Sequence, residues 1–401
     1  MIGNAKLVIV AALSLVIAAG TFARIINVPG DYAAIQAAIN AGNDGDTVLV
    51  NPGIYYENVD FYGHNVVLAS LFLTTGDISY IEQTIIDGDS SGSVVTFQSG
   101  ENNTAVITGL TLQNGVRDFG GGIRCTGISS PTIEYNIITN NAGLWAAGGV
   151  YFESTFSLFS HNVVYHNYTI GFGGGIVCIL DSNPTIINNT ISDNVALWGG
   201  GISYMESSIP VIINTICWGD SAVSNSPEVF GDETSMPTFS YCDVENNVLP
   251  GEGNIAVDPM FVDPYSGDFH LLGASPCIDA GDPDSPCDPD STRADMGALY
   301  YDRTTGIRDN PVLPRKIVLN QNFPNPFNAS TTIRYELPER AHVRIDICDL
   351  IGRKVTTLTD GLQPAGFHQV LWRAEDLSSG IYFYKIQAGD FVAAKKLLLV
   401  K

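Results

Sequence analysis

The 401-residue sequence predicts an all-β protein, built as a parallel β-solenoid with an N-terminal capping helix and followed by a small β-sandwich. Three observations predict this fold class. The middle of the chain repeats every 26 or 27 residues without a helical period. Residues 319–401 alternate polar and apolar side chains in short runs separated by glycines. Charge also divides the chain: residues 24–310 hold 34 acidic and 6 basic residues, whereas residues 311–401 hold 8 and 12. Such asymmetry indicates two domains.

The repeat consists of short β-branched runs separated by Asn, Gly, Ser or Pro. Each unit opens on a Gly-Gly-apolar triplet, and the triplets end at spacings of 27, 26 and 26, at Ile123, Val150, Ile176 and Ile202. A unit of this length cannot form a domain alone, but it can form one triangular turn of a solenoid, stacked about 4.8 Å above the last. One Asn precedes a later strand of each unit, at Asn136, Asn162, Asn189 and Asn214. We expect these Asn side chains to form an internal ladder from turn to turn.

The first 40 residues combine an export signal with a cap for the solenoid. Lys6 precedes an apolar run, and small residues follow up to Ala23. This layout predicts a secretory signal peptide over residues 1–23. Further on, Asp31 is placed to act as the N-cap of a short helix whose apolar face holds Ala34, Ile35, Ala38 and Ile39. Such a helix would cover the open apolar end of the solenoid.

Two long segments resemble a known family. The stretch "YAAIQAAINAGNDGDTVLVNPGIYYENV" resembles the N-terminal cap of pectin-lyase-like right-handed parallel β-helix proteins, and the Gly-Gly and Asn repeats resemble their coils. The stretch "DPMFVDPYSGDFHLLGASPCIDAGDPDSPCDPDSTRADMGALYYD" is similar to the segment that closes many bacterial exported β-helix proteins. The resemblance implies a right-handed parallel β-helix domain over residues 24–305. It implies no single activity, because this fold carries lyases, hydrolases and adhesins.

The C-terminal part, residues 319–401, follows a linker at 306–318 and reads as an Ig-like β-sandwich of five to seven strands. It closely resembles the C-terminal sorting domain of the type IX secretion system. The matching residues are Pro324, Asn325, Pro326, Phe327, Asn328, Gly380, Tyr382, Lys395 and Lys396. Cys348 and Ala329 depart from the family pattern. The resemblance implies that the outer-membrane type IX machinery is a partner, that the protein is secreted or attached to the cell surface, and that the mature chain does not span a membrane.

Large aromatic residues stand before the glycines of each repeat, at Phe119, Trp145, Phe172 and Trp198. On a solenoid they must form a column along one edge. If the column faces outward, it is a rail on which sugar rings could stack, and the four aromatics are ligand-binding candidates. If it faces inward, it is packing. The sequence favours packing or a partly buried stack.

Acidic and cysteine residues offer two further candidates. The densest acidic run resembles a calcium loop loosely, without the Gly that an EF-hand needs, and its carboxylates are Asp282, Asp284, Asp288, Asp290 and Asp295. The alternative is a solvated loop. Candidate disulfides are Cys217 with Cys242, one repeat apart, and Cys277 with Cys287, in one loop.

No catalytic residue is predicted. Residues 24–310 contain no Lys, and only Arg117 and Arg124 lie in the repeats. The strongly negative charge excludes nucleic acid as a partner. We expect an exported, surface-associated protein that binds glycans or another surface. The alternatives are a Ca²⁺-dependent polysaccharide lyase or a glycoside hydrolase, and a structural component of the cell surface. Carboxylates converging with an Arg on one groove would favour the enzyme, and an exposed aromatic column would favour binding.

Overall fold

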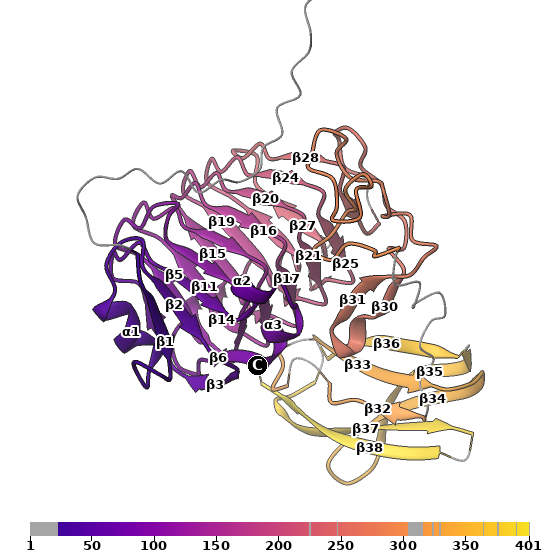
Figure 1. Ribbon diagram of the computed structural model, residues 1–401. Coiled ribbons are helices and arrows are strands. Elements are labelled where there is room, and N and C mark those ends of the chain that lie inside the picture. The colour runs from indigo at the N-terminus through magenta and orange to yellow at the C-terminus, as the bar shows by residue number, and fades with distance from the viewer. Residues whose placement is uncertain are drawn as a thin grey trace, which may run out of the picture.

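The computed structural model describes residues 23–223, 226–246, 248–303, 316–322, 325–328, 330–363, 365–374, 377–389 and 391–400. The predicted signal peptide, apart from Ala23, lies outside the described residues, and so do Pro324 and most of the predicted linker. In Figure 1 the N-terminal part of the chain forms one elongated stack of strands, and the C-terminal strands, in yellow, form a separate layered body beside it.

The N-terminal part is a parallel β-solenoid of about eight turns, as predicted. Each full turn passes through four stacked sheets, rather than the three of a triangular coil, and all strand pairs in them are parallel. The nine-stranded sheet holds β1 (Ile25–Val28), β2 (Thr47–Val50), β5 (Val67–Ser70), β8 (Val106–Thr108), β12 (Thr132–Glu134), β16 (Leu158–Ser160), β20 (Thr185–Ile187), β24 (Val211–Ile213) and β28 (Thr238–Ser240). The eight-stranded sheet holds β3 (Gly53–Tyr56), β6 (Thr84–Asp87), β9 (Thr111–Gln113), β13 (Ile137–Thr139), β17 (Val163–Tyr165), β21 (Thr190–Ser192), β25 (Ile216–Trp218) and β29 (Asp243–Val244).

The other two stacked sheets complete each turn. The five-stranded sheet holds β10 (Val116–Phe119), β14 (Ala142–Ala146), β18 (Tyr168–Thr169), β22 (Val195–Ala196) and β26 (Ser221–Ala222). The seven-stranded sheet holds β4 (Val59–Asp60), β7 (Val95–Phe97), β11 (Ile123–Cys125), β15 (Val150–Glu153), β19 (Ile176–Ile179), β23 (Ile202–Tyr204) and β27 (Val229–Gly231). The residues that end the Gly-Gly-apolar triplets are paired in register in this last sheet and are fully buried, which confirms the repeat.

Polar ladders line three corners of the coil, where the sequence predicted one. At the first corner, Asn162 Oδ1 accepts bonds from Asn136 N and Nδ2, and Asn189 Oδ1 does the same for Asn162. Asn214 is not the next rung, because the repeat is one residue out of register there. Thr215 takes that place by accepting from Asn189 N, while Asn214 has φ +50° on the turn beside it.

A second Asn ladder and a hydroxyl ladder were not predicted. Asn141, Asn167 and Asn194 form the second ladder, between the eight- and five-stranded sheets. At the corner before the nine-stranded sheet, hydroxyls of Ser182, Ser208 and Ser235 accept backbone N–H bonds of the preceding turn. Each ladder satisfies buried backbone donors that the sharp corners leave unpaired.

The predicted capping helix is present as α1 (Ile35–Ala41), which lies over β1 and β2 with Ile35, Ala38 and Ile39 buried. Figure 1 shows it at the N-terminal end of the stack. Asp31 is not its N-cap. Its carboxylate instead accepts from Asn27, and Glu57, from the next turn, accepts bonds from the first two helical N–H groups, at 2.8 and 2.9 Å. The short helices α2 (Phe72–Thr75) and α3 (Ser79–Gln83) interrupt the following turn. No helix among the described residues is long and apolar enough to cross a membrane.

The closing segment carries the hairpin β30 (Phe261–Asp263) and β31 (Asp268–Leu271), joined by the 3₁₀ helix η1 (Pro264–Ser266), against the outside of the eight-stranded sheet. Neither predicted disulfide is formed, because all seven cysteines are free thiols. Cys217 pairs in register with Val244 rather than with Cys242, so the two thiols sit at different positions of their turns. Cys277 donates a bond to Asp243, and Cys287 is exposed.

The C-terminal part is a two-sheet antiparallel body, as predicted. One sheet holds β32 (Val318–Leu319), β33 (Ser330–Leu337) and β36 (Gly366–Arg373). The other holds β35 (Lys354–Gln363), β34 (Ala341–Cys348), β37 (Gly380–Ala388) and β38 (Phe391–Leu399). A separate apolar core lies between the sheets, around Ile333, Ile345, Trp372, Tyr384 and Leu397.

Candidate binding surface

The predicted aromatic column lies at the edge between the five- and seven-stranded sheets. Phe119 pairs in register with Ala146, Ala146 with Phe172, and Phe172 with Trp198. The sequence predicted that all four aromatics occupy equivalent positions. This is wrong for Trp145, because Ala146 takes the equivalent position in its turn. Its repeat has one extra residue, which forms a bulge in the pairing of β10 with β14 and moves Trp145 one position outward.

The column faces solvent. The exposed fractions are 41% for Phe119, 63% for Trp145 and 38% for Trp198, whereas Phe172 is half-buried. Three aliphatic side chains beside them are also exposed: Leu144, Ile170 and Leu197. We call these seven residues the aromatic ridge. The expectation of a partly buried stack fits Phe119, Phe172 and Trp198, each of which is more than half covered, whereas Trp145 is mostly exposed.

A small apolar cluster outside the coil supports the ridge. Phe230 from β27 contacts Phe172 and Trp198, with ring centroids 5.7 and 5.3 Å apart. Tyr151 from β15 lies 5.3 Å from Phe119 in the same way. Buried Val177 belongs to this cluster, on the outer face of the seven-stranded sheet. The ridge therefore stands on packed side chains, which limits the motion of its rings.

The glycines after the aromatics bend the chain over this cluster. Gly120, Gly173 and Gly199 have φ between +60° and +74°, a conformation that L side chains rarely adopt. A Cβ on Gly173 would lie 2.3 Å from Val177 Cγ2. Glycine thus allows the loop to approach the sheet closely enough for the aromatic rings to rest on its outer face.

Polar groups border the N-terminal end of the ridge. Arg124 Nη1 donates to Gln98 Oε1 at 3.0 Å, and Gln98 Nε2 donates to Asp60 at 2.6 Å. Tyr151 Oη donates to Glu153 at 3.0 Å. This surface thus combines flat apolar rings with hydrogen-bonding groups that neighbouring side chains hold in place.

The predicted calcium loop uses its carboxylates within itself. Asp282 accepts a bond from Asp284 N, and Asp288 accepts one from Asp295 N. Asp290 and Asp295 likewise accept backbone amides of the same segment. Across the parts of the chain that the structure describes, no three His, Cys, Asp or Glu side chains are grouped so that they could hold a metal ion. The calcium site stays a prediction.

Carboxyl groups that the sequence analysis missed close the second Asn ladder. Asp220 takes the rung after Asn194, and its Oδ1 accepts from Asn194 N and Nδ2 at 2.7 and 2.9 Å. Burial raises the pKa of Asp220 to about 8, and burial next to Asp220 raises the pKa of Glu228 as well. Asp220 Oδ2 and both Glu228 oxygens lack a donor partner among the described residues, and a proton shared between Asp220 Oδ2 and one Glu228 oxygen would satisfy two of these three atoms. The only signal in the sequence was Asp in place of a repeated Asn.

Replacing Asp220 with Asn should stabilise the protein at high pH. The folded chain keeps a proton that the unfolded chain releases above about pH 4, so this site's contribution to stability falls as the pH rises and is lost above about pH 8. The amide of Asp220→Asn stays neutral, continues the ladder and can donate to Glu228. We expect a gain of about 1–2 kcal/mol at pH 8 and almost none at pH 4, measured by thermal unfolding. Asp284→Asn, at an exposed carboxylate, is the control. A loss of stability at pH 8 would contradict the shared proton.

The sorting-motif residues are built into the C-terminal body. Phe327 is buried, lies 5.4 Å from the Trp372 ring and donates its N–H to Leu398 O. Asn325 Oδ1 accepts from Leu398 N. The remaining described matches are exposed Asn328 and Pro326 in the same segment, Gly380 and Tyr382 on β37, and Lys395 and Lys396 on β38.

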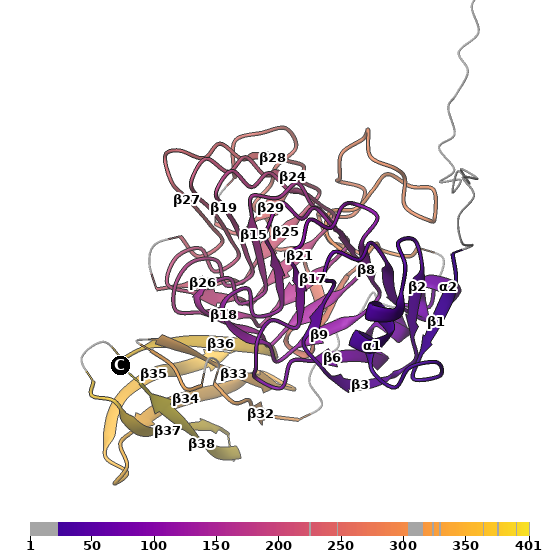
Figure 2. The same cartoon turned by 90° about the vertical axis from the view of Figure 1, so that its left-hand side faces the viewer.

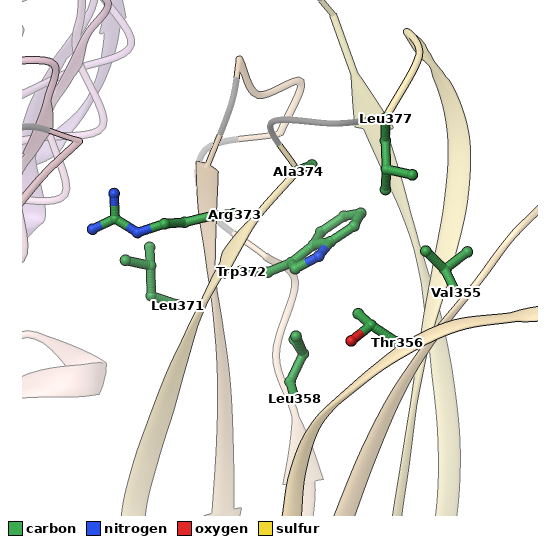
Figure 3. Close-up of a pocket in the computed structure, with 8 residues that line it drawn as sticks. All are labelled: Val355, Thr356, Leu358, Leu371, Trp372, Arg373, Ala374 and Leu377. Carbon is green, nitrogen blue, oxygen red and sulfur yellow. The ribbon is translucent and has the colours of Figure 1, made fainter.

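A cavity of about 500 Å³ lies at the open side of this body, between the edge strands β35 and β36. Figure 3 shows Trp372 pointing into it, toward Val355 and Leu358, while the neighbouring Arg373 points the opposite way, toward the coil. The cavity is thus a gap beside the sandwich core, and it is separate from the aromatic ridge.

Each of the two parts of the chain matches the model of a known family. Residues 53–216 match the model of the right handed beta helix region, and residues 321–401 match that of the secretion system C-terminal sorting domain. The second match indicates secretion through the type IX system to the cell surface or the extracellular space.

One curated relative is similar to part of this chain. It is the metabotropic glutamate receptor-like protein R of Dictyostelium discoideum, which is 25% identical over 179 residues. The alignment covers 43% of this chain and 10% of that protein. The chain thus spans about a tenth of its length, so the likeness concerns one segment of each.

Proposed function

We propose that this protein, a right-handed β-helix protein with a type IX sorting domain, binds polysaccharide outside the cell through the aromatic ridge. The observation that supports the proposal is the row of exposed rings held on a rigid stack of strands. Exposed apolar patches on a soluble protein mark interaction sites, and aromatic rings are the side chains most often dominant in binding.

The negative charge of the coil favours some classes of polysaccharide over others. Residues 24–310 carry 34 acidic and 6 basic residues, so a polyanionic glycan would be repelled over most of the coil. A neutral glycan meets no such barrier and can stack its apolar ring faces on Phe119, Trp145 and Trp198. We therefore infer that neutral polysaccharides are the preferred ligands.

The double substitution Trp145→Ala with Trp198→Ala tests this function. Loss of two anchoring rings should weaken binding at least about 30-fold, because such anchors contribute 1–2 kcal/mol or more each. Stability should fall by no more than about 1–2 kcal/mol, because Trp145 is 63% exposed and Trp198, which is 38% exposed, packs only on the outer surface of the coil against Phe230. A glycan array identifies the ligand, and titration calorimetry on the full chain then gives the affinity.

Phe156→Ala is the matched control, because Phe156 is 65% exposed at another corner of the coil. It should bind like the wild type. If the double variant keeps full affinity for every glycan that the wild type binds, the ridge is not the site. If it loses several kcal/mol of stability, the rings serve packing instead. Release of unsaturated uronate by the wild type would favour the lyase alternative.

A further inference from the structure

The three-stranded sheet of the sorting domain is covered on both faces. Along β33, Ile333, Tyr335 and Leu337 face the sandwich core. Thr332 and Arg334 point to the other side, yet each is only 8% exposed. A two-sheet sandwich leaves its outer faces to solvent unless another element packs there. Figure 2 shows that element to be the coil, and Leu371 of β36 lines one cavity together with Ser221 of β26.

Two arginine side chains make polar contacts across this interface. Arg334 Nη2 lies 2.7 Å from Asp193 Oδ1, and both side chains are buried. The Arg334 guanidinium also contacts His166 Nε2. Arg373, which points toward the coil in Figure 3, donates to Val223 O at 3.0 Å. His166 and Asp193 occupy equivalent corner positions of successive turns, both with positive φ, so the coil presents them side by side.

Arg334 enters an acidic pocket. A cavity of about 300 Å³ at the interface is lined by four carboxyl residues of the coil, Asp193, Asp220, Glu228 and Glu245, and by Arg334 of the sorting domain. Burial raises the pKa of Asp193, and the charge of Arg334 opposes that rise. Burial and Arg334 lower the pKa of His166 to about 3, so a neutral imidazole faces the guanidinium.

The surrounding charges complement each other. The acidic excess of residues 24–310 meets a C-terminal part with 12 basic and 8 acidic residues. A buried ion pair contributes little net stability, but removing one partner leaves a charge buried without compensation, which is strongly destabilising. Correct docking therefore depends on Arg334 meeting Asp193, whereas another orientation would leave both unpaired.

We propose that the coil carries a docking surface for its own sorting domain, with Arg334 inserted at Asp193 as the central contact. The sorting domain is then fixed to the protein that it accompanies rather than tethered loosely. Its three-stranded sheet is hidden, and the four-stranded sheet β35-β34-β37-β38, with exposed Lys385 and Lys396, is the face left for the secretion machinery. Carboxylates converge with an Arg in this pocket, but the arrangement does not support the enzymatic alternative, because the sorting domain supplies the Arg and covers the pocket.

Variants of the full-length chain test the docking. Arg334→Glu places a fifth acidic group in the pocket, and Arg334→Lys keeps the charge. The control is Arg344→Glu, at a partly exposed residue of the other sheet that pairs with Asp346. Small-angle X-ray scattering reports the maximum dimension, and hydrogen exchange reports protection of β22 and β26. We expect Arg334→Glu to lengthen the particle and to speed exchange in these strands about tenfold, while the lysine variant and the control resemble the wild type.

A second variant separates undocking from misfolding. Asp193→Asn leaves the sorting domain's sequence unchanged and should give the same scattering and exchange changes as Arg334→Glu. In both variants, protection of β34 and β37 should match the wild type, which shows that the sorting domain remains folded. The proposal is overturned if the wild type is already extended, or if Asp193→Asn stays as compact and protected as the wild type. Glycan binding is not involved, so these outcomes do not depend on the proposed function.

Discussion

Replacing Asn162 with Ala is expected to lower the free energy of unfolding by about 3–4 kcal/mol, far more than an ordinary polar substitution. Asn162 is fully buried. Its Oδ1 accepts two bonds from Asn136, and its Nδ2 donates to Ile133 O and Ser160 O. Alanine would remove all of these bonds at once and leave backbone groups buried without partners, each costing about 1–3 kcal/mol.

Chemical denaturation of the full chain, followed by fluorescence, measures this loss. Asn103→Ala is the control, because Asn103 is exposed in the loop between β7 and β8 of the same coil. It should change stability by less than about 0.5 kcal/mol. If Asn162→Ala costs no more than the control, the ladder is not a stabilising network and the corners depend on backbone pairing alone.

The repeat made the ladder predictable, but only where its register is regular. Asn136, Asn162 and Asn189 recur beside a clear strand signal, so the fold's need for a buried amide at each corner could be inferred. Asn214 resembled a further ladder residue because Asn occurs both at the ladder position, as in Asn189, and at the positive-φ position directly before it, as in Asn188. The structure assigns the rung to Thr215 instead, since a hydroxyl also accepts the bond. Spacing alone cannot separate adjacent corner positions.

The aromatic ridge shows a similar limit. The interval between aromatics predicted a column, and the column exists. Which way it faces depends on whether the seven-stranded sheet already has a packed outer layer, and Tyr151 and Phe230 supply part of that layer, each from the turn that follows the aromatic it contacts. The one-residue bulge before Ala147 was visible as a spacing of 27, but its effect on Trp145 follows only from the strand pairing.

The docking surface was beyond sequence reasoning. Asp193 and Arg334 are separated by 141 residues, and each alone looks like an ordinary surface charge. Only the difference in charge between the two parts of the chain pointed to complementary partners. Asp220, which replaces a repeated Asn, lies in the same acidic pocket. Its protonation depends on Glu228 and on burial beneath the sorting domain, and neither could be inferred from the sequence.

Replacing Gly149 with Ala is expected to destabilise the coil by about 3 kcal/mol, although alanine adds only a methyl group. A Cβ at Gly149 would lie 2.5 Å from Gly175 O and 3.0 Å from Val164 Cγ1. The same relation joins Gly122 to Gly149 O at 2.6 Å and Gly175 to Gly201 O at 2.7 Å. These glycines form a column along the coil. The carbonyl of each glycine occupies the space that a side chain on the glycine of the preceding turn would need. Backbone cannot move aside as a flexible side chain does, so the turns would have to separate locally.

Gly361→Ala is the matched exchange, because a Cβ there meets no atom within 4 Å and β35 continues past it. It should be neutral or slightly stabilising, since alanine restricts the unfolded chain. Calorimetry gives the two stabilities, and hydrogen exchange shows whether β11, β15 and β19 lose protection together in Gly149→Ala. Equal stabilities of the two variants would mean that the turns can spread at no cost, and that the recurring Gly-Gly pairs serve only the bend beneath the aromatic ridge.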